Sequence, residues 1–145
     1  MAGFFDGEGY IGLLKRNRSD KYTEYIIQMS IGQNDGSTMD WIKENYGGHL
    51  HLVKRDGSYQ WIVSNRQAYI VLKQITPYLK YKKPQAELAI QFFEGRQQGK
   101  KCSSVEIARR ENIYKKLKEA KRIFSKAKLC NSAGSTTKRI DPKGM

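Results

Sequence analysis

The chain has 145 residues, which is enough for one domain and short of two. Its 27 lysine and arginine residues against 14 acidic ones give a net charge of +13. This surplus indicates a polyanionic partner, with nucleic acid favoured over an anionic membrane surface. No apolar run approaches the roughly 18 residues of a membrane span, and no secretory signal is visible. The two cysteines, Cys102 and Cys130, have no CxxC partner, so we expect free thiols in a reducing, intracellular compartment.

The first residues, from Ala2 to Ile11, predict a short apolar helix that ends on glycines and acids. Gly3 and Gly7 lie four positions apart, so one helix face is almost bare and would let a second helix pack closely. Asp6 and Glu8 follow where the helix ends, and the glycines that flank Glu8 permit close approach of a backbone or a ligand. The stretch therefore places a carboxylate at a helix–strand junction. A plain helix cap followed by a solvated turn is the alternative.

Two β-hairpins follow from strict alternation of apolar and polar residues. The first joins strands at 10–18 and 22–33, and the second joins strands at 49–55 and 58–64. An Asp-Gly pair at 56–57 indicates a type I′ turn in the second hairpin. Each hairpin has one apolar face and one mixed polar face, as expected for an antiparallel sheet with one face on the core.

Helices are predicted between and after the hairpins. A capping pair of Ser37 with Asp40 opens a helix that runs to about Tyr46. Further helices are expected at 66–75 and at 84–94, the latter with Pro84 in its first turn.

The C-terminal part of the chain predicts one more helix. A capping box of Ser103 and Glu106 opens it, and it runs to about Lys128. Its outer face is dense in lysine and arginine. The tail at 131–145 is expected to be disordered.

The element order is therefore αββαββαα with a further C-terminal helix. We expect an α+β fold in which four strands form one antiparallel sheet and the helices cover its apolar face. Residues 1–95 form the core, and the basic loop and C-terminal helix at 96–130 belong to the same domain. The other face of the sheet is left open, mixed and basic.

The opening string and this element order together resemble the LAGLIDADG homing endonucleases. Residues 1–9, MAGFFDGEG, match the nine-residue motif, and residues 78–88, YLKYKKPQAEL, look like the family's basic segment before its next helix. The resemblance covers about residues 1–95. It implies the αββαββα homing-endonuclease fold with a saddle-shaped sheet. It also implies site-specific hydrolysis of double-stranded DNA at a long target, in the setting of intron homing.

The chain carries one motif, so the resemblance implies a homodimer through the motif helix at Ala2, Gly3 and Gly7. A two-fold symmetric dimer would read a pseudo-palindromic site, with each sheet in one major-groove half-site. Because the first motif position falls on Met1, the helix is expected to be short. Contacts from the helix after Pro84 or from the C-terminal helix are expected to support the dimer.

The resemblance also names the residues that would do the chemistry. Glu8 matches the family's metal-binding acid, with the Gly7 carbonyl as a second ligand, and these hard oxygen donors suit Mg²⁺, with Mn²⁺ as a possible substitute. The family position more often carries Asp, so the longer Glu8 is expected to shift the metal slightly. Asp6 is expected to be structural.

Two further catalytic residues follow from the resemblance. Lys82 matches a basic residue near the cleavage centre that stabilises developing charge or organises water; a phosphate clamp or a solvated lysine is the alternative. Gln33 matches a position that orders water, and an ordinary strand-end glutamine is the alternative. The family's further basic residue falls near Ser37, so Lys82 or Asn34 would compensate.

DNA contacts are expected from outward strand positions and the basic connector. Arginine can read guanine, glutamine can read adenine, and glutamate can accept from cytosine; a solvated strand face is the alternative. The candidates are Tyr10, Arg16, Arg18, Glu24, Gln28, Ser30, Arg55, Gln60 and Lys80. Phosphate contacts are expected from Lys100, Lys101, Lys115 and Lys116. His49 and His51 share a strand face without a third ligand, which favours a groove-facing polar role over a zinc site.

Two other functions remain open from the sequence. One is a non-catalytic module on the same fold, either a DNA-binding regulator or an RNA-splicing maturase; the acid at Glu8 and the lysine at Lys82 favour the enzyme. The other is a generic RNA-binding α/β domain, which the absence of an aromatic RNP-type stretch disfavours. The compartment stays open between a prokaryotic cytoplasm and an organelle such as a chloroplast or mitochondrion.

Overall fold

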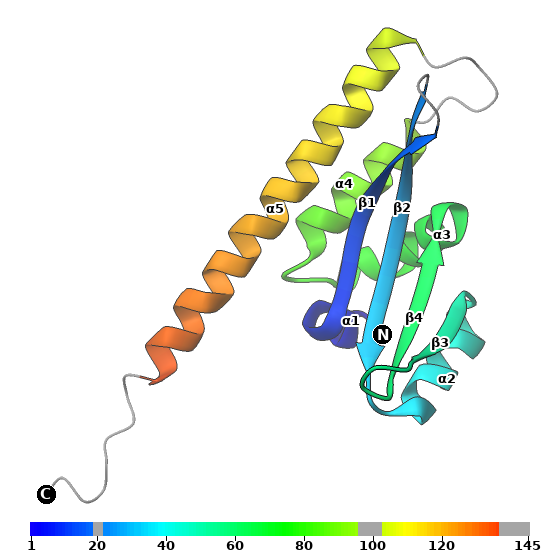
Figure 1. Ribbon diagram of the computed structural model, residues 1–145. Coiled ribbons are helices and arrows are strands. Elements are labelled where there is room, and N and C mark those ends of the chain that lie inside the picture. The colour runs from blue at the N-terminus through cyan, green and yellow to red at the C-terminus, as the bar shows by residue number, and fades with distance from the viewer. Residues whose placement is uncertain (19–21, 96–102, 137–145) are drawn as a thin grey trace, which may run out of the picture.

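The computed structural model describes residues 1–18, 22–95 and 103–136. Ten elements follow one another within these residues, and the predicted α+β order is confirmed (Figure 1). Their bounds are α1 (Ala2–Glu8), β1 (Gly9–Arg18), β2 (Tyr22–Gln33), α2 (Gly36–Tyr46), β3 (His49–Val53), β4 (Ser58–Ser64), α3 (Asn65–Ile75), the 3-10 helix η1 (Thr76–Tyr78), α4 (Lys83–Glu94) and α5 (Ser104–Thr136).

The four strands form one antiparallel sheet in the order β1-β2-β4-β3. Helices α3 and α4 lie behind this sheet in Figure 1, and α5 passes along the outer edge formed by β1. The register pairs apolar residues with one another across the strands, as in Leu13 with Ile27 and Met29 with Val63. Because side chains alternate between the two faces of a strand, this register places all of these residues on the helix-covered face.

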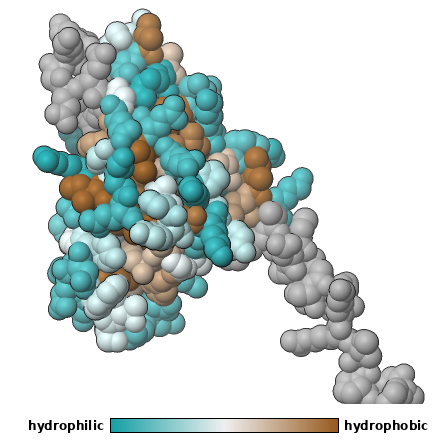
Figure 2. Space-filling view, turned by 180° about the vertical axis from the view of Figure 1, so that it is seen from behind, coloured by the Kyte–Doolittle hydropathy of each residue, from teal (hydrophilic) through white to brown (hydrophobic). Residues whose placement is uncertain are grey.

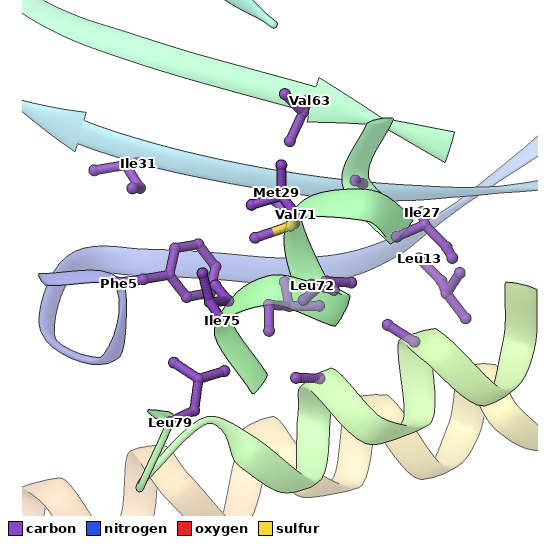
Figure 3. Packing of buried hydrophobic residues seen from close by; sticks show 14 of the residues in the cluster. Phe5, Leu13, Ile27, Met29, Ile31, Val63, Val71, Leu72, Ile75 and Leu79 are labelled. Carbon is purple, nitrogen blue, oxygen red and sulfur yellow. The ribbon is translucent and has the colours of Figure 1, made fainter. Parts of the chain in front are cut away.

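The core fills the space between the sheet and the helices. Phe5 and Trp61 are fully buried, and burial of each such side chain contributes about 1.5–3 kcal/mol. Phe5 points from α1 toward Ile75 of α3, with Leu79 close by (Figure 3). The motif helix is therefore anchored in the core by one aromatic side chain.

The tip of the second hairpin differs from the prediction. We expected a two-residue turn with Arg55 on the strand, but β3 ends at Val53 and residues 54–57 form a four-residue turn. The Gly57 N–H donates to the Val53 carbonyl at 2.9 Å, and Gly57 has a φ of +72°, which suits glycine. The Asp56 side chain accepts from the first N–H of β4 at 3.0 Å. These local bonds close the turn two residues early, so Arg55 lies exposed in the turn and not on the strand face.

The cap of α2 also differs. The N-cap is Asp35, whose Oδ1 accepts from the Ser37 backbone N–H at 3.1 Å. The predicted pair of Ser37 with Asp40 is wrong, because Ser37 donates to the cap and does not form it. By contrast, Ser103 Oγ accepts from the backbone N–H three residues on, at 3.2 Å, as predicted for the start of α5.

Helix α5 extends to Thr136, which is eight residues beyond its predicted end at Lys128. The first six residues of the tail expected to be disordered, 131–136, are therefore helical. Each residue added to an existing helix gains a backbone hydrogen bond, and a single glycine such as Gly134 costs only about 1 kcal/mol. The rest of the predicted tail lies outside the described residues.

The helix-covered side of the molecule is mostly hydrophilic, with apolar side chains scattered among polar ones (Figure 2). In the part of the chain that the structure describes, no helix combines the length and the apolar character that crossing a membrane requires.

Candidate functional site

The motif helix α1 ends in a tight junction with β1. The Gly9 N–H donates to the Phe5 carbonyl and closes the last turn of the helix. A Cβ at Gly9 would lie 2.3 Å from the Phe5 ring, so only glycine lets the chain pass this close to the buried aromatic side chain. The junction therefore fixes the position from which the side chain of Glu8, the last residue of α1, projects into solvent.

One face of α1 is bare. A Cβ placed at Gly3 or at Gly7 would meet no atom within 4 Å, and both glycines are exposed. The 3-10 helix η1 packs beside α1. In this region Tyr78 and Tyr81 are 74% and 69% exposed. The face formed by Gly3 and Gly7 is therefore a surface on which a second helix could pack closely.

Asp6 has a structural role, as expected. One carboxylate oxygen accepts the backbone N–H of Lys80 at 2.7 Å, and the other accepts the backbone N–H of Lys82 at 2.9 Å. Hydrogen bonds to an ionised acceptor are roughly twice as strong as neutral ones. Asp6 therefore ties the segment from Leu79 to Lys82, called here the connector, to the last turn of α1.

The connector delivers Lys82 to the same helix end. Lys82 is only 6% exposed, which is costly for an ammonium group unless it is compensated. Its Nζ donates to the Asp6 carbonyl, and it lies 5.0 Å from the centre of the Phe124 ring on α5. The carbonyl lies at the negative end of the helix dipole, and the aromatic face also attracts a cation. Lys82 is therefore held in place by both α1 and α5.

Glu8 and Gln33 lie at the same end of the first hairpin. Gly9 pairs with Ile31 at the end of the β1–β2 ladder, and Gln33 lies two residues further on. Glu8 is exposed, whereas Gln33 is half-buried and its Oε1 accepts from the Asn34 backbone N–H at 2.9 Å. Glu8, Gln33 and Lys82 thus come from separate segments and lie around the C-terminal end of α1.

The oxygen donors at this helix end suit a hard cation whose remaining ligands come from elsewhere. Within residues 1–18, 22–95 and 103–136, no group of three histidine, cysteine or acidic side chains could hold a metal ion. One protomer supplies the exposed Glu8 carboxylate. The last carbonyl groups of a helix lack partners within the helix. In α1 the Phe5 carbonyl accepts from the Gly9 N–H and the Asp6 carbonyl accepts from the Lys82 ammonium group. The carbonyl that follows these two in the chain belongs to Gly7, and it is the candidate metal ligand. One carboxylate and one carbonyl match the way Mg²⁺ is bound beside phosphates and water.

The sheet face opposite the core, called here the open face, carries most of the predicted DNA contacts. Alternation and register place seven of them there: Tyr10, Arg16, Arg18, Glu24, Gln28, Ser30 and Gln60. Gln28 lies between Gly12 and Ser64, whereas Gln60 lies opposite Gly32 and His51. Gly32 leaves open space beside Gln60, whereas the Tyr10 side chain lies over Gly12 beside Gln28.

Five of the predicted contacts have particular surroundings. Arg18 forms an ion pair with Glu24, with Nε 2.9 Å from Oε2. Arg16 pairs with Glu24 across the β1–β2 ladder. Lys80 is exposed on the connector, and Arg55 lies in the β3–β4 turn, so neither belongs to the open face. The predicted phosphate contacts Lys100 and Lys101 fall outside the described residues.

Histidines 49 and 51 share the open face, as predicted. Both are exposed on β3, where His49 pairs with Ile62 and His51 pairs with Gln60. The described part of the chain provides no third metal ligand beside them. Their placement is therefore that of polar side chains on the open face.

A polar cluster fixes α5 against the sheet. Tyr25 is buried on β2, and its hydroxyl donates to Glu111 of α5. Burial and the Glu111 carboxylate hold the pKa of Tyr25 above its ordinary range. Lys15 of β1 donates to the same carboxylate at 3.1 Å. This cluster sets the position of α5 along β1.

The sequence reasoning missed two lysines on α5. Lys121 lies with its Nζ 4.0 Å above the Tyr10 ring, and Lys118 lies 5.6 Å from the Tyr114 ring. The helical period could have identified both lysines, because they lie next to the apolar stripe of α5 that includes Leu117 and Phe124. That pattern cannot name the aromatic partners, since Tyr10 lies more than a hundred positions away in the chain.

Comparisons with known proteins agree with this architecture. A family model described as LAGLIDADG endonuclease matches residues 1–97. The archaeal intron-encoded homing endonuclease I-Vdi141I, solved in complex with DNA, is similar with a TM-score of 0.72 and 19% identity, over 82% of this chain and 80% of that one. The homing endonuclease I-CvuI, in complex with the I-CreI target in 2 mM Mg with DNA not cleaved, gives 0.66 and 19%, over 86% and 91%.

The meganuclease I-SmaMI, bound to uncleaveable DNA, is similar with a TM-score of 0.67 and 15% identity, over 81% of this chain and 43% of that one. At these identities the likenesses establish the fold. A search of curated protein sequences finds no match.

Proposed function

The chain belongs to the LAGLIDADG endonuclease family, and on that premise we propose that it is a site-specific endonuclease. It hydrolyses phosphodiester bonds in double-stranded DNA with the help of a divalent metal ion. The observation that carries the proposal is the position of Glu8: its carboxylate is exposed at the end of a motif helix whose neighbouring face is bare.

Glu8 and the Gly7 carbonyl are the residues that would hold the metal. Mg²⁺ keeps several waters and is commonly bound by one or two carboxylates together with substrate phosphates, so a site with one carboxylate per protomer is sufficient. Mn²⁺ accepts the same oxygen donors and can substitute for it. When bound, such an ion supplies charge neutralisation at the phosphate and an activated water.

Lys82 and Gln33 act around the same helix end. The Lys82 side chain lies beside the last turn of α1, and its role there would be to stabilise negative charge that develops on the scissile phosphate. Its contacts with Asp6 and Phe124 limit its rotation, so little reorganisation is needed during the reaction. Gln33 supplies an amide group that can orient water by hydrogen bonding.

The open face reads the DNA. Arg16 is suited to guanine, Gln28 and Gln60 are suited to adenine, and Glu24 can accept from cytosine. Tyr10 and Ser30 stand nearest the motif helix, on the row of the sheet next to Gly9. The antiparallel sheet thus presents side chains in the order in which they would meet successive base pairs of a major groove.

A second copy of the chain completes the enzyme. Each protomer supplies one Glu8, and packing of two α1 helices through Gly3 and Gly7 would bring the two carboxylates to one two-fold axis. Such isologous packing matches a pseudo-palindromic target. Tyr78 is 74% exposed on η1, which packs beside α1, and it would add apolar area to this interface.

The test of the activity is cleavage selection from a randomised DNA duplex library with Mg²⁺, which reports activity, symmetry and target together. The Glu8→Gln variant is expected to bind the selected site and to lose cleavage with both Mg²⁺ and Mn²⁺. Glu44→Gln, which makes the same change at an exposed site on α2, is the matched control and should cut normally. Normal cleavage by Glu8→Gln would refute the assignment, and a wild-type protein that binds without cutting would favour the non-catalytic module.

The test of the dimer is Gly3→Leu. A leucine side chain has room within the protomer, because no atom lies within 4 Å of the Cβ position, but it would block close approach of a second α1. We expect an unchanged melting temperature of the isolated protomer and a lower dimer fraction by sedimentation velocity. A wild-type protein that binds its target as a monomer would contradict the symmetric assembly.

A further inference from the structure

A row of lysine ammonium groups follows the seam between β1 and α5, each placed against an aromatic ring. The Lys15 and Lys118 Nζ atoms lie 5.7 and 5.6 Å from the centre of the Tyr114 ring, and the Lys121 Nζ lies 4.0 Å from the centre of the Tyr10 ring. A lysine side chain normally loses considerable rotamer freedom when it binds an anion. Contact with a ring restrains the side chain beforehand, so less freedom is lost on binding.

The acids near this seam are already engaged. Glu111 accepts from Lys15 at 3.1 Å and from the Tyr25 hydroxyl, and Glu119 pairs with Arg122 at 2.6 Å. Among the described residues, no carboxylate lies within ion-pair distance of Lys118 or Lys121. Their positive charges are therefore offset by ring faces alone.

The position of Tyr10 places these lysines beside the open face. A Cβ at Gly12 would lie 2.4 Å from the Tyr10 hydroxyl, so the Tyr10 side chain lies flat over Gly12 on that face. Lys121 covers the same ring. The adjoining surface of α5 forms a shallow concavity lined by Lys115, Lys118, Glu119, Lys121, Arg122 and Ser125. In Figure 1, α5 borders the sheet on the side of β1.

We expected the open face to be basic, but among the described residues it carries little net positive charge. Arg18 is paired with Glu24, which leaves Arg16 as the main unpaired cation on β1 and β2 among the described residues. Affinity for duplex DNA comes largely from neutralised phosphates, and contacts to phosphates are distinct from contacts that read bases. The cations that bind the backbone must therefore come from beside the sheet.

We propose that Lys118 and Lys121 form a phosphate-binding strip, which holds the backbone of one DNA strand along the outer edge of β1. The proposal deepens the proposed DNA-binding function. The strip supplies affinity and orientation and reads no bases, and Tyr10 links it to the open face by fixing Lys121.

The experiment measures binding of a labelled duplex of random sequence by fluorescence anisotropy, in EDTA, over a range of KCl concentrations. The slope of log K against log salt is expected to fall in magnitude by about 0.9 for each lost phosphate contact, and thus by about 1.8 for Lys118→Gln/Lys121→Gln. The charge-preserving pair Lys118→Arg/Lys121→Arg should keep the wild-type slope. Because EDTA prevents cleavage, this result is independent of whether the chain is an endonuclease.

A lysine at the opposite edge of the sheet provides the matched control. Lys43 is exposed on α2, which packs on β3 and β4, whereas the seam follows β1 at the other edge of the sheet. Lys43→Gln should therefore leave the slope nearly unchanged. Melting curves by circular dichroism verify that all variants fold. An unchanged slope in the double variant, or an equal change in Lys43→Gln, overturns the proposal. It also fails if the double variant loses binding to single-stranded RNA or to anionic phospholipid vesicles while duplex binding is kept.

Discussion

The two acids of the motif helix lie two residues apart, and we expect opposite effects on stability and activity when the charge of each is removed. Asp6 accepts two backbone N–H groups of the connector, at 2.7 and 2.9 Å, whereas Glu8 is exposed. The informative perturbation is Asp6→Asn, which keeps the side-chain shape and removes the charge. Asparagine has one oxygen, so its NH₂ group must face one of the two N–H donors.

The cost follows from these contacts. A hydrogen bond to a charged group contributes about 1.5–3 kcal/mol. Asp6→Asn weakens one of the two bonds and replaces the other with two donors facing each other. We therefore expect a loss of about 2–3 kcal/mol in the free energy of unfolding, which corresponds to about 5–10 °C in melting temperature for a chain of this size.

The assay is urea unfolding followed by circular dichroism, with Glu8→Gln as the matched control. Glu8→Gln makes the same change of charge on the same helix, and its stability should stay within about 0.5 kcal/mol of the wild type. Asp6→Asn should therefore be the unstable variant and Glu8→Gln the stable, inactive one. If both lose the same stability, the effect comes from net charge and the connector is not held by Asp6. If neither loses stability, the two hydrogen bonds contribute nothing measurable.

Two further predictions concern packing and pH. Gly9→Ala should destabilise the protein by about 1–3 kcal/mol, because its Cβ would lie 2.3 Å from the Phe5 ring; a thermal melt that matches the wild type would contradict this. Glu106 accepts from Arg109 and Arg110, and the hydrogen bond from Arg109 is the main cause that holds its pKa below the ordinary value of 4.5. Its stabilising contribution is present above pH 4.5 and is lost as the pH falls below it. The urea midpoint should therefore fall less steeply with acidification in Glu106→Gln than in the wild type, and parallel profiles would refute the role.

Alternation along the strands was sufficient to predict the sheet and its two faces. A one-residue slip would move every side chain to the wrong face, so the pattern placed Leu13, Ile27, Met29 and Val63 on the apolar face. It did not predict the strand order β1-β2-β4-β3, which pairs Met29 with Val63. The ends of elements were harder to predict, because neighbouring polar residues are each suited to the N-cap position. At α2 the N-cap is Asp35, and the backbone N–H and the hydroxyl of Ser37 both donate to its carboxylate.

The candidate site was predictable only where it is local. Glu8 follows from the end of a helix pattern, whereas the Asp6–Lys82 hydrogen bonds join residues 76 positions apart. No period of the sequence reports such a contact. The contact between the Phe124 ring and Lys82 was also not predictable, because a helical pattern identifies the buried side of α5 but not the residues that it contacts.

Helix α5 is therefore linked to the candidate cleavage centre and is more than a C-terminal extension. Phe124 covers Lys82, and the Lys82 ammonium donates to the last turn of the motif helix. Three positions earlier, Lys121 covers Tyr10 on the open face, two residues from Glu8. A shift of α5 along β1 would disturb both contacts at once, because one rigid helix carries both residues. A DNA strand held by α5 would then stabilise the same helix position that keeps Lys82 beside α1, which couples backbone binding to the geometry of the site.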